Sequence, residues 1–222
     1  KAIAYAIDKE AMNIACYDGH AVIADFMIQP QNTGAPAKGV VYHYDPEKAK
    51  EYVKKSAYPN GTHVGTINCS AGGYFEKMAQ VLQSNLLDIG LTCDINRLDS
   101  ATNMEMSRSQ RYDMITTGFS PTGDYEGWRM YSYTKMVGSY YVKYESDKFD
   151  YKTMDALWDA GIATFDLAER QKIYSQLSDW LANTATQIPI FHKVQPYVWT
   201  PDLNIPVNYP NYPQICEWSW AK

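Results

Sequence analysis

The amino-acid sequence predicts an α/β fold in which helices flank a largely parallel or mixed sheet. The first half alternates segments with helix and strand patterns, and such alternation is typical of α/β layer structures. Residues 75–89 place apolar side chains at helical spacing and stop at Gly90. Residues 91–95 then alternate apolar and polar side chains, as a half-buried strand does.

The N-terminal segments are predicted to be mainly helical. Asp8 is a suitable N-cap for a short helix that ends near Cys16. Tyr44-Asp45-Pro46-Glu47 offers a cap, a proline in the first turn and an acid for a later helix. Residues 20–39 are apolar at first and then rich in Gln, Asn, Pro and Gly, so we expect an irregular surface stretch there.

The sheet is expected to come from the middle of the chain. Strands are predicted over residues 62–69, 91–95 and 114–117. Asp99 or Ser100 should cap the helix that separates the last two strands and ends near Gln110. Residues 125–150 are rich in Tyr, Ser and Gly without a clear period, which predicts a loop.

The C-terminal part is predicted to hold two helices, one edge strand and a tail. The helices cover residues 152–163 and residues from Asp166, where a D-x-x-E capping signal stands, to Leu181. Residues 188–192 read as a strand that Pro189 restricts to an edge or a start. The tail contains five prolines and needs another surface to lie on. We therefore divide the chain into domains 1–192 and 193–222.

Composition favours a binding protein. The net charge is −5 and no basic run occurs, so the electrostatic footprint of a nucleic-acid binder is missing. The 19 Tyr and 6 Trp offer large contact faces with a polar edge. The four cysteines are widely spaced, which predicts free thiols, with one or two disulfides as the alternative.

The sequence contains no catalytic or metal-binding motif that we recognise. Nucleophile-elbow, zincin, Walker and dinucleotide-binding patterns are absent from it, and its four histidines are scattered. We expect neither a metal nor a cofactor, and we do not expect an enzyme.

The predicted ligand contacts lie where the strand of residues 114–117 runs out into a loop broken by Gly and Pro. Such loops carry the ligand contacts of many α/β proteins, because the strand holds them rigidly. Asp124 lies beside an aromatic cluster that could strengthen its pairing with a ligand ammonium. The alternative is an Asx-turn in which Asp124 satisfies its own backbone. The candidate ligand-binding residues are Gly118, Phe119, Ser120, Asp124, Tyr125 and Trp128.

Several motifs, in the same order, resemble the extracellular solute-binding proteins of family 5, which include the dipeptide- and oligopeptide-binding proteins of ABC transporters. Each is modest alone, but their joint order over nearly the whole chain is specific. They are KAIAYAIDKE at 1–10, YDPEKAK at 44–50, YPNG at 58–61, AQVLQSNL at 79–86, IGL at 89–91, YDM at 112–114, GF at 118–119, AER at 168–170 leading to Tyr174, and IPI at 188–190.

This resemblance implies a lobe of the type II periplasmic-binding-protein fold. Family members close two lobes on a ligand, so residues 1–192 would be the second, ligand-binding lobe and residues 193–222 would return to the first. In the family, Gly-Trp is followed by an Asp that pairs with the amino terminus of a peptide. Gly118 matches, Phe119 replaces the Trp, and Asp124 comes two residues later than usual.

The resemblance further implies a role in import by an ABC transporter. The protein would capture a peptide by hinge closure and deliver it to a membrane permease, acting as a monomer in the periplasm or lipid-anchored on the outer face of the cell membrane. Ser120 and the backbone near Gly118 would bond the main chain of the ligand, and Phe119, Tyr125 and Trp128 would line a side-chain pocket. Alternatives are an oligosaccharide, a nickel chelate or, less favoured, a hydrolase that uses Asp124.

Overall fold

The computed structural model describes residues 1–118, 124–135, 149–194, 196, 198–205, 216 and 218–220. Phe119, Ser120 and the rest of the loop through 123 lie outside the described residues, as do residues 136–148. Contacts divide the chain into two units, Lys1–His192 and Lys193–Lys222.

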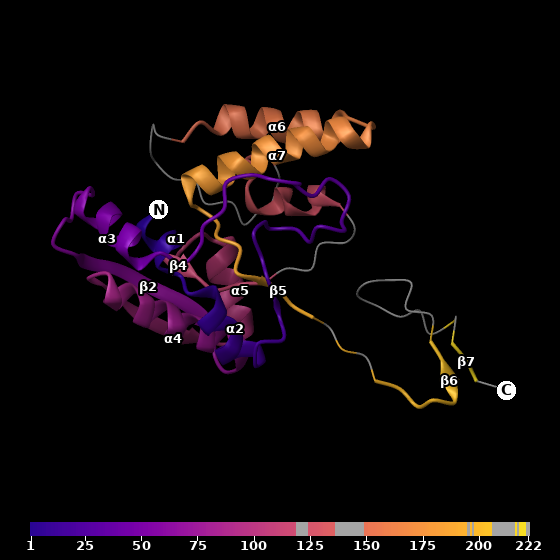
Figure 1. Ribbon diagram of the computed structural model, residues 1–222, viewed down its shortest axis with the longest axis horizontal. Helices are drawn as coiled ribbons and strands as arrows, with labels where there is room; N and C mark the ends of the chain where they lie inside the picture. The colour runs from indigo at the N-terminus through magenta and orange to yellow at the C-terminus, as the bar shows by residue number, and fades with distance from the viewer. Residues whose placement is uncertain are drawn as a thin grey trace. The chain divides into compact units, whose positions relative to one another are not determined.

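The first unit contains a three-stranded parallel sheet, with α4 (Gly73–Asp88) beside β2 (Thr62–Ser70) in Figure 1. The middle strand of the sheet is β2, which pairs with β3 (Leu91–Leu98) on one side and with β4 (Met114–Ile115) on the other. Parallel neighbours need crossover connections, and α4 and α5 (Ser100–Arg108) supply them. This arrangement confirms the predicted α/β class.

Short capped helices precede the sheet. They are α1 (Ala2–Ala6), α2 (Lys9–Tyr17) and α3 (Pro46–Lys54). Asp8 caps α2 by accepting a hydrogen bond from the Ala11 N–H at 2.9 Å, and Asp45 caps α3 through the Lys48 N–H at 2.9 Å. Both predicted caps are confirmed. The first hydrophobic core lies between α1, α3, the sheet and α4, and its buried members are Ala6, Ala49, Val53, Ile67, Cys69, Ala79, Leu86, Ile89, Leu91 and Cys93.

A second core forms where α6 (Tyr151–Ala163) packs against α7 (Leu167–Thr184), as Figure 1 shows. Asp166 caps α7 by accepting from the Glu169 N–H at 2.8 Å, so the predicted D-x-x-E signal is confirmed. The prediction of a loop is wrong for Tyr125–Tyr131, which form a 3-10 helix, η1. The buried ring of Tyr125 anchors this helix to α6 and α7 in the second core. The buried residues of this core are Ile28, Ala35, Tyr125, Met154, Trp158, Tyr174, Leu177 and Leu181.

Two short strands, of which the sequence revealed only the second, join distant parts of the first unit. β1 (Val22–Ile23), inside the stretch predicted to be irregular, pairs antiparallel with β5 (Phe191–His192). Only the last two residues of the strand predicted over 188–192 pair in this way, and Pro189 precedes them. The Ala24 N–H extends the contact by donating to the Ile190 carbonyl at 3.0 Å.

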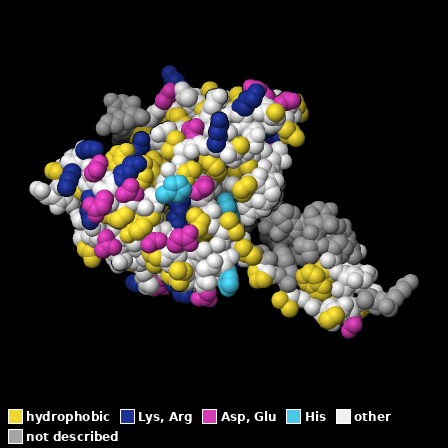
Figure 2. All heavy atoms as spheres, viewed as in Figure 1, with side chains coloured by type: hydrophobic (Ala, Val, Ile, Leu, Met, Phe, Trp, Pro, Cys, Tyr) yellow, Lys and Arg dark blue, Asp and Glu magenta, His cyan; other side chains and the backbone are white. Residues whose placement is uncertain are grey.

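In the described part of the second unit, β6 (Leu203–Asn204) pairs antiparallel with β7 (Ser219–Trp220). Cys16, Cys69, Cys93 and Cys216 are all free, as predicted. Acidic and basic side chains are interspersed over the face of the molecule drawn in Figure 2. Within the described residues, no helix combines the length and the apolar character that crossing a membrane requires.

Candidate functional site

A cavity of about 380 Å³ lies along β4 in the first unit, beside the second core and beside a third cluster of buried residues, Ile7, Met12 and Met78. The cavity is lined by β4 with the residues on either side of it, from Tyr112 to Gly118, and by the end of η1. Small-molecule sites commonly have volumes of ~300–1,000 Å³. In α/β proteins, ligands bind outside the carboxyl ends of the strands, where the strand order reverses. β4 meets this condition, because the chain passes from β2 to β3 on one side and then returns to β4 on the other.

The lining is mainly apolar and adaptable. Methionine side chains are flexible and polarizable, so they fit irregular apolar groups, and aromatic rings offer flat contact faces. Because β4 is an edge strand in the described sheet, one side of its main chain is not used by the ladder. The cavity therefore combines an apolar wall with backbone donors and acceptors. Its methionine and aromatic members are Met12, Met27, Met78, Met114, Met154, Tyr112, Trp128, Tyr131, Phe149, Tyr151 and Trp180.

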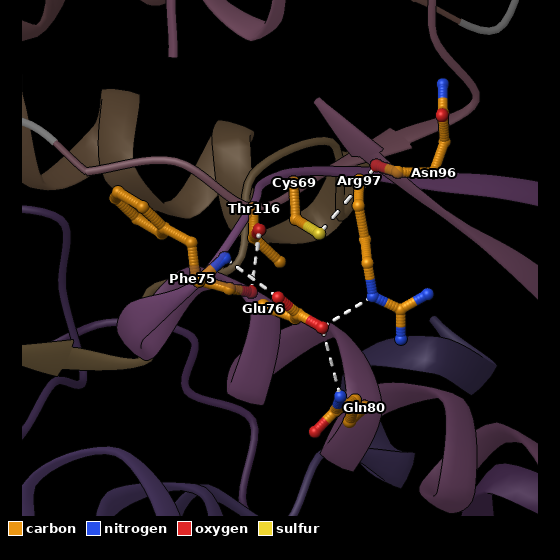
Figure 3. Close-up of polar contacts among 8 residues, drawn as sticks. Cys69, Phe75, Glu76, Gln80, Asn96, Arg97 and Thr116 are labelled. Atoms are coloured by element: carbon orange, nitrogen blue, oxygen red, sulfur yellow. Dashed lines mark hydrogen bonds and ion pairs between the residues drawn. The ribbon is translucent and has the colours of Figure 1, made fainter. Parts of the chain in front are cut away.

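The carboxyl end of β4 is fixed to the first turns of α4 (Figure 3). The Thr116 hydroxyl donates to the Phe75 carbonyl at 3.1 Å, and the Thr116 N–H donates to the Asn68 carbonyl at 3.0 Å. At Gly118, an added Cβ would lie 3.2 Å from the Phe75 ring, so the backbone passes close to that side chain. The chain thus passes Gly118 close to a helix that holds the end of β4 in place.

A charged network holds the neighbouring connection between β2 and α4 (Figure 3). Glu76 accepts from Arg97 Nε at 2.5 Å and from the Gly72 N–H at 2.8 Å. These bonds, with Arg97 as the larger cause, hold the pKa of the Glu76 carboxyl below its ordinary value. The network joins the start of α4 to the end of β3, so the carboxyl ends of the strands are fixed together.

The six predicted ligand contacts do not all lie at the cavity. Gly118 and Trp128 line the cavity, and Phe119 and Ser120 lie outside the described residues. Tyr125 is 0% exposed, and burial raises its pKa. Its ring stacks on Tyr174 with centroids 4.8 Å apart, so it faces the second core.

Asp124 has partners within the protein. One carboxylate oxygen accepts from the Glu126 N–H at 2.9 Å, which caps η1 and is the Asx-type contact named as the alternative. The other oxygen lies 2.9 Å from Arg170 Nη1. Asp124 and Tyr125 are not among the residues around the cavity, so direct contact between either residue and a solute stays a prediction.

Most residues of the cavity wall were not predicted from the sequence. Met27 and Gln187, for example, come from segments with no binding motif and meet the strand only in three dimensions. The only signal in the sequence was the total of nine methionines, which does not indicate a position. No group of three or more His, Cys, Asp or Glu side chains in the described part of the chain is arranged to hold a metal ion.

Comparison with known proteins identifies the family. The profile of the bacterial extracellular solute-binding proteins, family 5 Middle, matches residues 1–141, which is more than half of the chain. The chain belongs to this family. Family 5 consists of solute-binding proteins, so the expectation that the chain is not an enzyme is confirmed.

Relatives in family 5 differ in the solute for which they are named. The chain is 25% identical over 200 residues to heme-binding protein A of Haemophilus influenzae, with 87% of the chain and 36% of the relative covered. It is 24% identical over 196 residues to the glutathione-binding protein GsiB of Salmonella paratyphi A, with 86% and 38% covered.

A solved structure in the same group supports the fold. The dipeptide-binding protein of a Pseudoalteromonas species, in complex with Met-Leu, superposes with a TM-score of 0.80 at 20% identity, covering 99% of this chain and 44% of that one. The predicted fold of a periplasmic-binding-protein lobe is thereby confirmed. The chain spans less than half of the length of each of these three proteins.

Proposed function

We propose that this chain is the ligand-binding lobe of a family 5 protein that captures a peptide between two lobes and delivers it to the permease of an ABC importer. The observation that carries the proposal is the cavity along β4, which combines an apolar wall with a strand that lies at the edge of the described sheet. An extended peptide uses both, because its backbone pairs with a strand edge while its side chains enter pockets.

The loop after β4 supplies the proposed contacts. Gly118 begins the loop at the fixed end of the strand, and Phe119 and Ser120 follow it directly. Trp128 lines the same cavity from η1 and offers a flat apolar face. In this proposal Asp124 and Tyr125 anchor the loop from the side of the second core.

The remainder of the proposal concerns the whole protein. Residues 193–222 form a separate unit and would return to the other lobe. The described part of this unit exposes aromatic side chains, with Trp220 at 72%, which would suit contact with another surface. We propose that the protein works as a monomer outside the cytoplasm, in the periplasm or lipid-anchored on the outer face of the cell membrane.

Binding measurements on the two-lobed protein and on residues 1–222 alone test the proposal. Isothermal titration with a random pool of di- to pentapeptides should show binding to the two-lobed protein. The chain alone should bind at least about tenfold more weakly, because half of the wall around the ligand is missing. Equal affinities would contradict the two-lobe mechanism. Binding of an oligosaccharide or of a nickel chelate instead of the peptide pool would contradict a peptide as the solute.

A further inference from the structure

The cavity beside β4 extends from the surface of the first unit into its interior. Thr117 and Gly118, just after the strand, line the cavity and are exposed. Met12 and Met154 line the same cavity and are only 2% and 1% exposed. A group that enters beside Gly118 therefore leaves water and meets side chains that belong to the protein interior.

Charge on the cavity wall is confined to its exposed part. Among the described residues that line the cavity, Lys1 and Asp113 alone carry a formal charge, and both are exposed. The Asp113 carboxylate already accepts a hydrogen bond from the Thr66 N–H at 2.9 Å. A charged group in the buried part would meet no oppositely charged side chain among the described residues of the wall. An unpaired charge is the most costly kind of group to bury.

Two polar side chains of the wall are held by contacts inside the protein. Ser132 Oγ accepts from Trp158 Nε1 at 3.1 Å, and Gln187 Nε2 donates to the Tyr131 carbonyl at 2.7 Å. Either side chain would lose its internal bond by turning toward a ligand, and a broken bond at a buried place is costly. Neither group is therefore placed to compensate a buried charge.

Methionines from five separate segments supply much of the apolar wall. Their thioethers are flexible and polarizable, so they adapt to apolar groups of different shapes. The wall therefore suits a class of side chains, and a cavity of about 380 Å³ has room for a large one. The five are Met12 of α2, Met27 between β1 and α3, Met78 of α4, Met114 of β4 and Met154 of α6.

We propose that this cavity selects peptides that carry a large apolar side chain, such as that of leucine, methionine or phenylalanine, and rejects charged side chains. Burial of the apolar side chain strengthens binding, whereas a charged one stays in water or enters without a partner. The inference rests on the proposed function, because it names the class of peptide that the same site takes.

The test compares three matched tripeptide pools on the two-lobed protein. Each pool is trialanine with one residue replaced, at each position in turn: by leucine, methionine or phenylalanine, by lysine or arginine, or by aspartate or glutamate. By isothermal titration, the wild-type protein should bind the apolar pool at least about tenfold more tightly than either charged pool. A smaller ratio, or a preference for a charged pool, would overturn the inference and leave the proposed function standing. Failure of all three pools to bind would overturn the proposed function, and the inference with it.

Met27 is the residue at which the wall is best altered, because it is half-buried and lies outside the helices and strands. Met27→Glu adds a carboxylate to the wall, so it should reduce the preference for the apolar pool over the lysine and arginine pool by about tenfold. Met27→Leu keeps the wall apolar and should keep the wild-type ratio. Met104→Glu is the matched control and should also keep it, because Met104 of α5 is 50% exposed and does not line the cavity.

Thermal unfolding of each variant shows whether a changed ratio comes from an intact fold. An unchanged ratio in a folded Met27→Glu protein, or an equal change in Met104→Glu, would overturn the assignment of the selectivity to this wall. If Met27→Glu does not fold, the comparison of the three pools on the wild-type protein decides the inference by itself.

Discussion

The carboxylate of Asp113 accepts a hydrogen bond from the Thr66 N–H at 2.9 Å, where the pairing of β2 with β3 shifts register. Gly65 makes this contact possible. Its φ of +93° suits glycine, and an added Cβ would lie 2.3 Å from Asp113 Oδ2. Asp113, just before β4, thus hydrogen-bonds the irregular part of the central strand β2.

Gly65→Ala should therefore lower the free energy of unfolding by about 2–4 kcal/mol, since backbone strain and a steric clash add. Urea denaturation of the chain measures the loss. Gly19→Ala is the matched control, because Gly19 also has a positive φ, +81°, but nothing lies within 4 Å of an added Cβ. The control should cost only about 1–2 kcal/mol. Equal losses in the two variants would show that the contact with Asp113 is unimportant.

Truncating Tyr125 and truncating Trp128, two of the three aromatic residues of η1, should have different effects. Tyr125→Ala opens a hole in the second core and should cost about 3–5 kcal/mol of stability. Trp128→Ala, on the cavity wall, should weaken solute binding by about tenfold with a smaller loss of stability. Denaturation and titration of both variants check this contrast. If Trp128→Ala bound solute as tightly as the wild type, Trp128 would not belong to the site.

Thr116→Val tests whether the fixed end of β4 matters for binding. The change removes the hydroxyl bond to the Phe75 carbonyl and should lower stability by about 0.5–1.5 kcal/mol. It should also weaken solute binding, because the loop then begins from a less rigid point. Thr92→Val, on β3, is the matched control: it removes only an exposed contact of 3.4 Å with His63 Nδ1, away from the cavity, and should leave solute binding unchanged. If Thr116→Val bound solute as tightly as the wild type, this hydrogen bond would have no role in binding.

His192 should make the stability of the first unit depend on pH. Burial lowers the pKa of this imidazole, with Lys9 acting in the same direction and Asp25 opposing. The unfolded chain then binds a proton that the folded chain does not, so the free energy of unfolding should fall as the pH decreases through about 6.5. His192→Gln should remove this part of the slope, which denaturation between pH 7.5 and pH 5 would measure.

The exposed His43 provides the control for this measurement. His43→Gln should keep the wild-type dependence on pH, because the other titrating groups are unchanged. An identical slope in His192→Gln and the wild type would mean that another group causes the loss of stability in acid.

Local signals explain which parts of the fold the sequence could predict. The caps at Asp8, Asp45 and Asp166 depend on residues three positions away, so the sequence displays them directly. The pairing of β1 with β5 joins Val22 to His192, and two-residue strands have no period to detect. Only the folding of the chain brings β1 and β5 together.

The same distinction applies to the site. Gly118 and Trp128 were found because breakers and aromatic residues cluster after a strand. The contact between Asp124 and Arg170 was not found, because the two residues belong to segments that only tertiary packing brings together. The sequence around each residue contains no motif that indicates the other residue as its partner.

The parallel order of the sheet has a consequence for biosynthesis. Because β2 lies between β3 and β4, its strand partners are made later than β2 itself, and no tight hairpin can pair them early. A nascent chain that ends before β3 leaves the apolar side chains of β2 without either partner strand, and one that ends before β4 leaves one edge of β2 without its partner. A chaperone that binds extended apolar segments should therefore associate with nascent chains that end between β2 and β4, and release them once β4 emerges.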